Sequence, residues 1–159
     1  MKNKSYLLKY AIDYLSKYNS SKKNLEKILK TRIQRSTNNT DARFKLYSNI
    51  EYVFKELEKN NLINDISYTQ SKIYSLVSQS KSKIFIQNYL INKGVQKSII
   101  FEELDEFEKK NYGWEKKSAY EFAKKKRLLD SNYKDQKKLG KMARAGFSYE
   151  LSKEILNIN

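Results

Sequence analysis

The sequence predicts an all-α fold, arranged as an elongated array of three tandem three-helix repeats. Three observations lead to this prediction. The 159 residues contain no proline and only four glycines, although sheets and their tight turns usually need both. Apolar residues recur at helical spacing along almost the whole chain. Finally, hydrophobic residues make up only 39% of the chain, which suits a thin core repeated along a slender molecule.

The apolar stripes predict nine short helices. In chain order the stripes are Leu7, Ala11, Tyr14, Leu15 and Tyr18; Leu25, Ile28, Leu29 and Ile33; Tyr47, Ile50, Val53, Phe54 and Leu57; Ile66, Ile73, Leu76 and Val77; Phe85, Ile86, Tyr89 and Leu90; Ile99, Ile100, Leu104 and Phe107; Ala119, Phe122, Ala123 and Leu129; Leu139, Met142 and Ala143; Leu151 and Ile155.

Capping residues separate the stripes. Ser20 or Ser21 is placed to cap the second helix, and Asp65 the fourth. Asn60 and Asn61 suit a left-handed position at the end of the third helix. Gly94 and Gly146 are expected just beyond the ends of the fifth and eighth helices, with positive φ. Phe147 is then expected to pack on the preceding helix, and Ser148 to cap the last one.

The predicted helices fall into three groups that resemble one another. Residues 90–104 (LINKGVQKSIIFEEL) match residues 142–156 (MARAGFSYELSKEIL), so that Gly94 aligns with Gly146. The expected repeats are residues 1–62, 63–110 and 111–159. The first repeat departs from the pattern, because a polar loop at about residues 34–43 replaces its glycine turn.

The composition excludes many functions. The chain has neither Cys nor His, so thiolate zinc sites, disulfides and Cys or His nucleophile–base pairs are impossible. The phosphate-binding pattern GxxxxGK[ST] is absent. Carboxylate pairs such as Glu102 and Glu106 could suggest acid–base chemistry, but no His or Cys accompanies them. We therefore expect no enzymatic activity, no cofactor and no metal.

The location is expected to be cytoplasmic, without membrane association. No apolar run approaches the roughly 20 residues that span a bilayer. The first 21 residues have no continuous apolar stretch and no small-residue cleavage site, so they are not read as a signal peptide. An amphipathic presequence is the alternative for this segment.

The charge of +15 favours a polyanionic partner. Residues 1–60 carry 14 basic and six acidic side chains, residues 61–110 seven and six, and residues 111–159 12 and six. The candidate contacts for a filament or for DNA are Lys81, Lys83, Lys124, Lys126, Lys137, Lys141 and Arg144.

Lys137, Lys141 and Arg144 share one helical face, opposite Leu139, Met142 and Ala143, which are expected to point inward. Contact with phosphates is the functional interpretation of these cations, and a merely solubilising face is the alternative.

Aromatic residues such as Tyr68, Tyr89, Phe122, Phe147 and Tyr149 are expected mainly in the core rather than as stacking platforms. The acidic stretch at residues 102–108 either pairs with neighbouring lysines or turns a face towards a protein.

Four segments carry a resemblance to a known family. They are YAIDYLSKYNSSKKNLEKIL (10–29), LEKNNLINDISY (57–68, with Asp65 and Tyr68), SKSKIFIQNYLINKGV (80–95) and KKLGKMARAGFSYELSKEIL (137–156). The last is the most specific, since its run from Leu139 to Glu150 closes many members of that family. Over about residues 6–157 the chain resembles the RecX family of RecA regulators, with a polar loop like that of alphaproteobacterial members. It departs from the family where Lys81 and Lys83 stand among serines in place of an arginine-rich run.

This resemblance implies a non-enzymatic protein whose partner is the RecA recombinase, often as the filament on single-stranded DNA. Independently of the resemblance, we expect weak, non-specific contact with the DNA backbone and a monomeric protein. Modulation of RecA, with inhibition as the expected direction, is the leading functional hypothesis. The alternative is a free-standing helical DNA-binding protein that condenses DNA or represses transcription.

Overall fold

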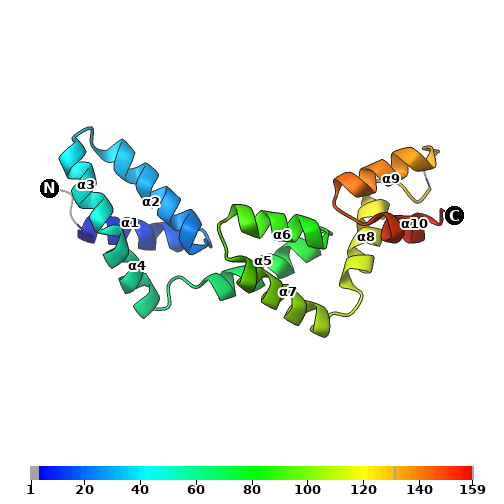
Figure 1. The fold of residues 1–159 in the computed structure, drawn as a ribbon, viewed down its shortest axis with the longest axis horizontal. Coiled ribbons are helices and arrows are strands. Elements are labelled where there is room, and N and C mark those ends of the chain that lie inside the picture. The colour runs from blue at the N-terminus through cyan, green and yellow to red at the C-terminus, as the bar shows by residue number, and fades with distance from the viewer. Residues whose placement is uncertain (1–3, 131, 159) are drawn as a thin grey trace. The chain divides into compact units, whose positions relative to one another are not determined.

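The computed structural model describes residues 4–130 and 132–158, and these residues form ten α-helices and no strand (Figure 1). The all-α prediction is therefore confirmed. The helices are α1 (Lys4–Leu15), α2 (Lys22–Ser36), α3 (Thr40–Ser48), α4 (Ile50–Lys59), α5 (Asp65–Ser78), α6 (Lys83–Asn92), α7 (Lys97–Lys110), α8 (Trp114–Lys125), α9 (Asp135–Arg144) and α10 (Tyr149–Leu156). None of the described helices has the length and apolar character required to cross a membrane.

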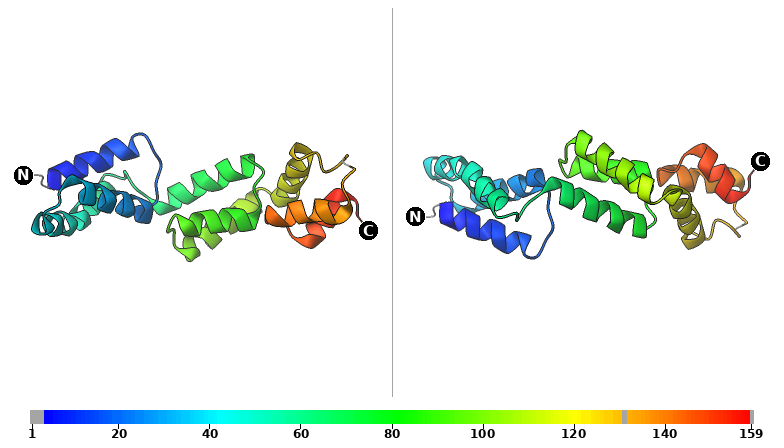
Figure 2. Two further views of the ribbon diagram at one scale, coloured as in Figure 1. Left: turned by 90° about the horizontal axis from the view of Figure 1, so that it is seen from above. Right: turned by 90° about the horizontal axis from the view of Figure 1, so that it is seen from below.

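The chain divides into two compact units. Unit 1 comprises Met1–Tyr68 and Lys93–Val95, and unit 2 comprises Thr69–Asn92 and Gln96–Asn159. In unit 1, α1 lies beside α4 and α2 (Figures 1 and 2). In unit 2, α10 packs on both α8 and α9. The three predicted repeats, residues 1–62, 63–110 and 111–159, stay a prediction.

The core of unit 1 confirms the stripes predicted for its helices. Its buried members are Leu7, Ala11, Leu25, Leu29, Ile33, Leu46, Ile50, Val53, Leu57 and Ile63. The end of the first stripe is wrong, because α1 ends at Leu15 and Tyr18 is 57% exposed. Tyr68, at the edge of this unit, is buried as expected.

The polar loop predicted at about residues 34–43 is wrong in extent, because only residues 37–39 lie between α2 and α3. A polar helix forms here for three local reasons. The Asn39 side chain accepts a hydrogen bond from the Ala42 amide (2.9 Å) and caps α3. Arg43 donates to the Thr37 carbonyl (2.8 Å), which closes the turn. Leu46 then anchors the helix in the core, so the described residues form ten helices where the stripes indicated nine.

The start of α5 corrects the role expected for Asp65. The Asn64 side chain accepts hydrogen bonds from the amides of Ile66 (2.8 Å) and Ser67 (3.1 Å), so Asn64 is the cap. Asp65 is the first helical residue, and its carboxylate instead accepts from the Lys22 amide at 2.8 Å. Because Asn and Asp are equally good caps, sequence alone could not choose between adjacent positions.

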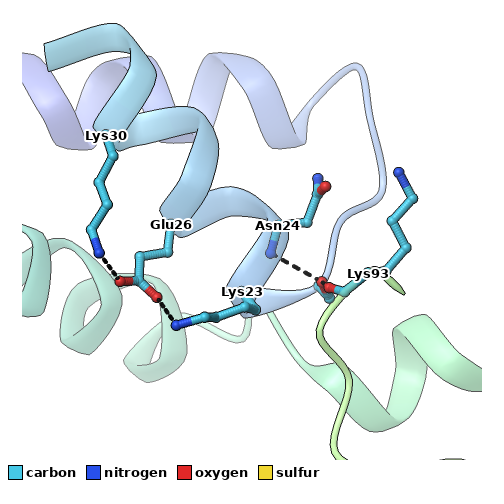
Figure 3. Close-up of polar contacts among 6 residues, drawn as sticks. Lys23, Asn24, Glu26, Lys30 and Lys93 are labelled. Atoms are coloured by element: carbon cyan, nitrogen blue, oxygen red, sulfur yellow. Dashed lines mark hydrogen bonds and ion pairs between the residues drawn. The ribbon is translucent and has the colours of Figure 1, made fainter. Parts of the chain in front are cut away.

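The first turn of α2 is held by residues distant in sequence (Figure 3). Ser21 caps the helix, accepting from the Asn24 amide (3.2 Å) and donating to the Lys93 carbonyl. Lys22 donates its amide to Asp65 and pairs its ammonium with Glu58. We call these contacts junction A.

The same helix also carries an ion-paired carboxylate. Lys23 and Lys30 both contact Glu26, and the hydrogen bond from Lys30 is the main reason that the pKa of Glu26 is lowered (Figure 3).

The first turn of α6 repeats this arrangement inside unit 2. Ser82 accepts from the Phe85 amide (3.2 Å) and donates to the Ala145 carbonyl (2.7 Å). Lys83 donates its amide to Glu115 (2.8 Å) and pairs its ammonium with Glu108 (2.7 Å). We call these contacts junction B. The two junctions therefore use the same kinds of side chain in the same roles.

A left-handed glycine completes each junction. Gly94 has a φ of +76° and Gly146 a φ of +88°, and each lies immediately after the capping residue of its helix, as predicted. A Cβ on Gly94 would come closer than 3.0 Å to the Lys23 side chain. A Cβ on Gly146 would meet the Ser82 hydroxyl at 2.5 Å. Glycine is required at both places by conformation and by space together.

The segment after α9 behaves as the sequence predicts. The Gly146 amide donates to the Ala143 carbonyl (2.9 Å) and the Phe147 amide to that of Met142 (3.2 Å), which is the Schellman pattern. Phe147 is buried, with its ring 5.5 Å from that of Phe122. Ser148 caps α10 by accepting from the Leu151 amide (3.2 Å).

A hydrophobic core cluster of unit 2 lies between α8, α9 and α10. Its buried members are Ala119, Ala123, Leu128, Met142, Phe147, Ile155 and Leu156. Two expectations for neighbouring residues are wrong: Ala143 and Tyr149 are exposed. Ala143 directly follows the fully buried Met142, and a step of one residue turns a helix by about 100°, which carries its side chain out of the core.

Gly140 is a glycine that the fold does not require. It lies inside α9 without a positive φ, and an added Cβ would make only an ordinary 3.7 Å contact with Arg144. We expect Gly140→Ala to stabilise unit 2 by about 0.5–1 kcal/mol, because alanine favours the helix interior. Urea unfolding followed by the fluorescence of Trp114, the single tryptophan of the chain, measures the change. A loss of stability would show that the contact with Arg144 is harmful.

Candidate nucleic-acid interface

Basic side chains gather where α8 ends and α9 begins. Lys124, Lys126 and Arg127 line an open hollow of about 780 Å³, together with Tyr133. Lys137 and Lys141, on α9, place their ammonium groups 4.7 Å and 4.0 Å from the centre of the Tyr133 ring. These five basic residues are called the basic cluster below. Tyr133 lies among them: three line the same hollow as Tyr133, and two place their ammonium groups over its ring.

The end of α8 fixes one side of the basic cluster. The Arg127 amide donates to the Lys124 carbonyl (2.9 Å), and the Leu128 amide to that of Ala123 (2.8 Å). This Schellman pattern puts Arg127 in the left-handed region, with a φ of +53°. Leu128 is fully buried, so the chain turns inward there while Lys124, Lys126 and Arg127 stay exposed.

The start of α9 fixes the other side. Lys137 and Lys141 lie four residues apart on one side of α9, and the ring of Tyr133, which precedes the helix, lies beneath both ammonium groups. Lys137 is exposed, Lys141 is half-buried and the Tyr133 side chain is 42% exposed. An ammonium group over an aromatic face is attracted by the ring quadrupole. The Tyr133 ring therefore holds two positive charges close to it, while part of the residue stays exposed to solvent.

Arg144 belongs to the same helix but does not contact Tyr133 in the described structure. Its guanidinium lies one turn back along α9, with Nη1 3.7 Å from the position of a Cβ on Gly140. The residue is exposed. The outward direction predicted for Lys137 and Arg144 is thus confirmed, while Lys141 is half-buried against the tyrosine ring.

The basic cluster combines five cations, none of which has an acidic partner in the described structure, around one hollow. Among residues 4–130 and 132–158, no ion pair or side-chain hydrogen bond engages any of its five members. Seven lysines elsewhere in the described structure are paired with carboxylates: Lys22, Lys23, Lys30, Lys55, Lys83, Lys109 and Lys116. Unpaired cations keep their full attraction for an external anion, so the basic cluster is the strongest candidate site for phosphates.

Lys81 and Lys83 have other surroundings. Lys81 lies over the Phe85 ring (4.6 Å), and Lys83 belongs to junction B through Glu108 and Glu115. The role of Lys83 in the described structure is therefore to hold the start of α6.

The acidic stretch of α7 pairs with neighbouring lysines. Lys109 contacts Asp105 (2.7 Å) and Glu106 (2.9 Å), which raises the pKa of the lysine, with Asp105 as the larger cause. Glu108 pairs with Lys83 of α6. The described residues contain no group of three or more Asp and Glu side chains arranged to hold a metal ion.

A second hollow, of about 540 Å³, lies beside Trp114 and is less suited to an anion. Its lysines, Lys117 and Lys125, share the lining with Glu121. Lys125 also donates a hydrogen bond to the Ser80 hydroxyl at 2.9 Å.

Sequence comparison identifies relatives of the whole chain. No family model matches it. A regulatory protein RecX of Myxococcus xanthus is 29% identical over 98% of this chain and 86% of its own length. A regulatory protein RecX of Lactococcus lactis is 34% identical over 68% of this chain and 42% of its own length. Over nearly its whole length the chain is similar to a RecX protein.

Solved RecX structures share the fold. A crystal structure of a regulatory protein RecX matches 98% of this chain and 72% of its own, with a TM-score of 0.72 and 22% identity. The crystal structure of RecX from Lactobacillus salivarius matches 98% of this chain and 97% of its own, with a TM-score of 0.69 and 22% identity. The helical architecture described above is therefore that of RecX.

Tyr133 is the residue of this candidate site that sequence reasoning missed. It lies outside every helix and outside every apolar stripe, so periodicity gave no reason to single it out. The signal that could have found it is its interval of four and eight residues from Lys137 and Lys141. Arg127 ends a run of four basic residues (124–127), but its left-handed backbone cannot be foreseen from that run.

Proposed function

We propose that this protein binds the RecA recombinase, in particular the filament that RecA forms on single-stranded DNA, and modulates its activity without catalysing a reaction. Inhibition is the expected direction. Similarity over nearly the whole chain to a protein named regulatory protein RecX supports the role, and the unpaired charges of the basic cluster support a nucleoprotein partner. We further propose that the protein acts as a monomer in the cytoplasm.

The physical requirement for regulation is unequal binding. A protein that binds the active and inactive states of a filament equally well leaves their populations unchanged. A modulator must therefore bind one state more tightly. The basic cluster would meet DNA phosphates or acidic protein surface in that state.

The test is to add the protein to RecA with single-stranded DNA and ATP and to follow ATP hydrolysis. Because one bound regulator acts on a filament of many subunits, we expect an effect well below one copy per RecA. An effect that appears only when the protein covers the DNA would instead support the alternative, a free-standing DNA-binding protein.

Neutralising one face of α9 should weaken the effect on RecA. Replacing Lys137, Lys141 and Arg144 together by Gln removes three positive charges and keeps good helix formers. We expect the triple variant to melt like the wild type, because none of the three has a hydrogen-bond or ion-pair partner among the described residues. Several times more protein should be needed for the same change in ATP hydrolysis, with a shallower dependence on salt.

A control variant separates local charge from net charge. Lys17, Lys45 and Lys59 are exposed residues of unit 1 without ion pairs in the described structure, and changing them to Gln removes the same total charge. This control should keep most of its potency. Equal losses in both triple variants would show that only the net charge matters, and no loss in either would make these side chains merely solubilising.

A further inference from the structure

The hollow beside Tyr133 brings together the two features that a nucleotide of a single strand requires. One is an aromatic ring that is partly open to solvent: Tyr133 is 42% exposed although Lys137 and Lys141 lie over its ring. The other is a set of cations nearby, supplied by the basic cluster. Asp130 is the one acidic residue in the lining, against three basic ones. The volume of about 780 Å³ lies within the range of small-ligand pockets.

We propose that this hollow binds single-stranded nucleic acid by stacking an unpaired base on Tyr133, while Lys124, Lys126 and Arg127 hold the adjoining phosphates. This rests on the proposed function only in part: it specifies how the protein contacts a strand, and it holds or fails without RecA. Stacking on a tyrosine tolerates every base, because each base has a π-face. It is denied to a base that is paired within a duplex, so Tyr133 selects single strands.

Lys137 and Lys141 have a distinct part in this arrangement. Their ammonium groups lie within 5 Å of the ring centre, so any strand that stacks on Tyr133 brings its backbone close to both. Because neither ammonium is paired with a carboxylate in the described structure, each can bind a phosphate without first breaking an ion pair. The two lysines therefore add to phosphate attraction around the stacked base.

Arg127 provides independent support. Glycine occupies the corresponding left-handed position after α6 and α9, where it costs nothing sterically, whereas arginine there is strained. The guanidinium has no hydrogen bond or ion pair in the described part of the chain that would explain its presence. Arg127 lines the hollow, where its guanidinium can bind a phosphate, although it contributes no such contact to the fold.

The test is fluorescence anisotropy with a labelled oligothymidylate, an abasic oligomer of equal length and a duplex. We expect the wild type to bind the oligothymidylate about tenfold more tightly than the abasic oligomer, the effect of one stacked base. Tyr133→Leu should lose this difference and leave abasic binding unchanged. Tyr133→Trp should keep it.

Two further variants act as controls. Tyr112 is 99% exposed and has no cation over its ring in the described structure, so Tyr112→Leu should bind like the wild type. Arg127→Gly should weaken binding to the oligothymidylate and the abasic oligomer by the same factor and lower the salt dependence, while raising the melting temperature.

Two results would overturn the inference. One is equal binding of the oligothymidylate and the abasic oligomer by the wild type. The other is unchanged oligothymidylate binding by a Tyr133→Leu variant that melts like the wild type. Because RecA is absent from these measurements, neither result bears on its regulation, which the ATP hydrolysis experiment decides separately.

Discussion

The Gly146→Val variant is expected to lose at least about 2 kcal/mol of the stability of unit 2. A branched side chain at a φ of +88° costs about 1–2 kcal/mol in backbone strain. Its Cβ would also meet the Ser82 hydroxyl at 2.5 Å, and forced repacking typically costs a further 1–3 kcal/mol. Urea unfolding followed by Trp114 fluorescence measures the loss, because Trp114 lies in unit 2.

Gly113 offers a control that separates these two costs. It has a φ of +72°, but nothing lies within 4 Å of the position of its Cβ. Gly113→Ala therefore reports backbone strain alone, whereas Gly146→Ala reports strain and crowding together. If the two alanine variants lose the same stability, the close approach between Gly146 and Ser82 is not important for the fold.

Ser82→Ala is expected to be nearly as damaging, at about 2–4 kcal/mol. The hydroxyl of this fully buried residue caps α6, and loss of such a cap costs about 1 kcal/mol. It also donates to the Ala145 carbonyl at 2.7 Å, which would be left without this donor at a cost of about 1–3 kcal/mol. The same unfolding experiment measures both effects.

The matched variant is Ser148→Ala. Ser148 caps α10 through the Leu151 amide, but it is exposed and its hydroxyl has no second partner among the described residues. We expect it to cost only about 1 kcal/mol. Similar losses in the two variants would mean that the bond from Ser82 to Ala145 adds nothing to stability.

Sequence reasoning succeeded where local chemistry decides the structure. The all-α class follows from helical periodicity, and the left-handed Gly94 and Gly146 follow from a steric rule that acts within a few residues. Ser148 caps its helix for the same local reason. The interval of four residues between Lys137 and Lys141 likewise places both on one side of α9.

It failed where the partner of a group lies far along the chain or where several local signals compete. Asp65 was expected to cap its own helix, but a tertiary partner, the Lys22 amide, takes its carboxylate. The polar segment that becomes α3 lacks an apolar stripe, so its helix depends on the Asn39 cap and on Arg43. Backbone carbonyls such as that of Ala145 leave no trace in the sequence at all.

Junction A has a consequence for how the chain folds as it is synthesised. The Ser21 hydroxyl needs the carbonyl of Lys93, which is made 72 residues later. Such long-range contacts form late, because closing a long loop costs conformational entropy before the contact contributes any stability. The nascent α2 must therefore wait until Lys93–Val95 has left the ribosome before its first turn is fully bonded. A fragment that ends at Tyr68 lacks part of unit 1, although it contains every helix that lies wholly within that unit.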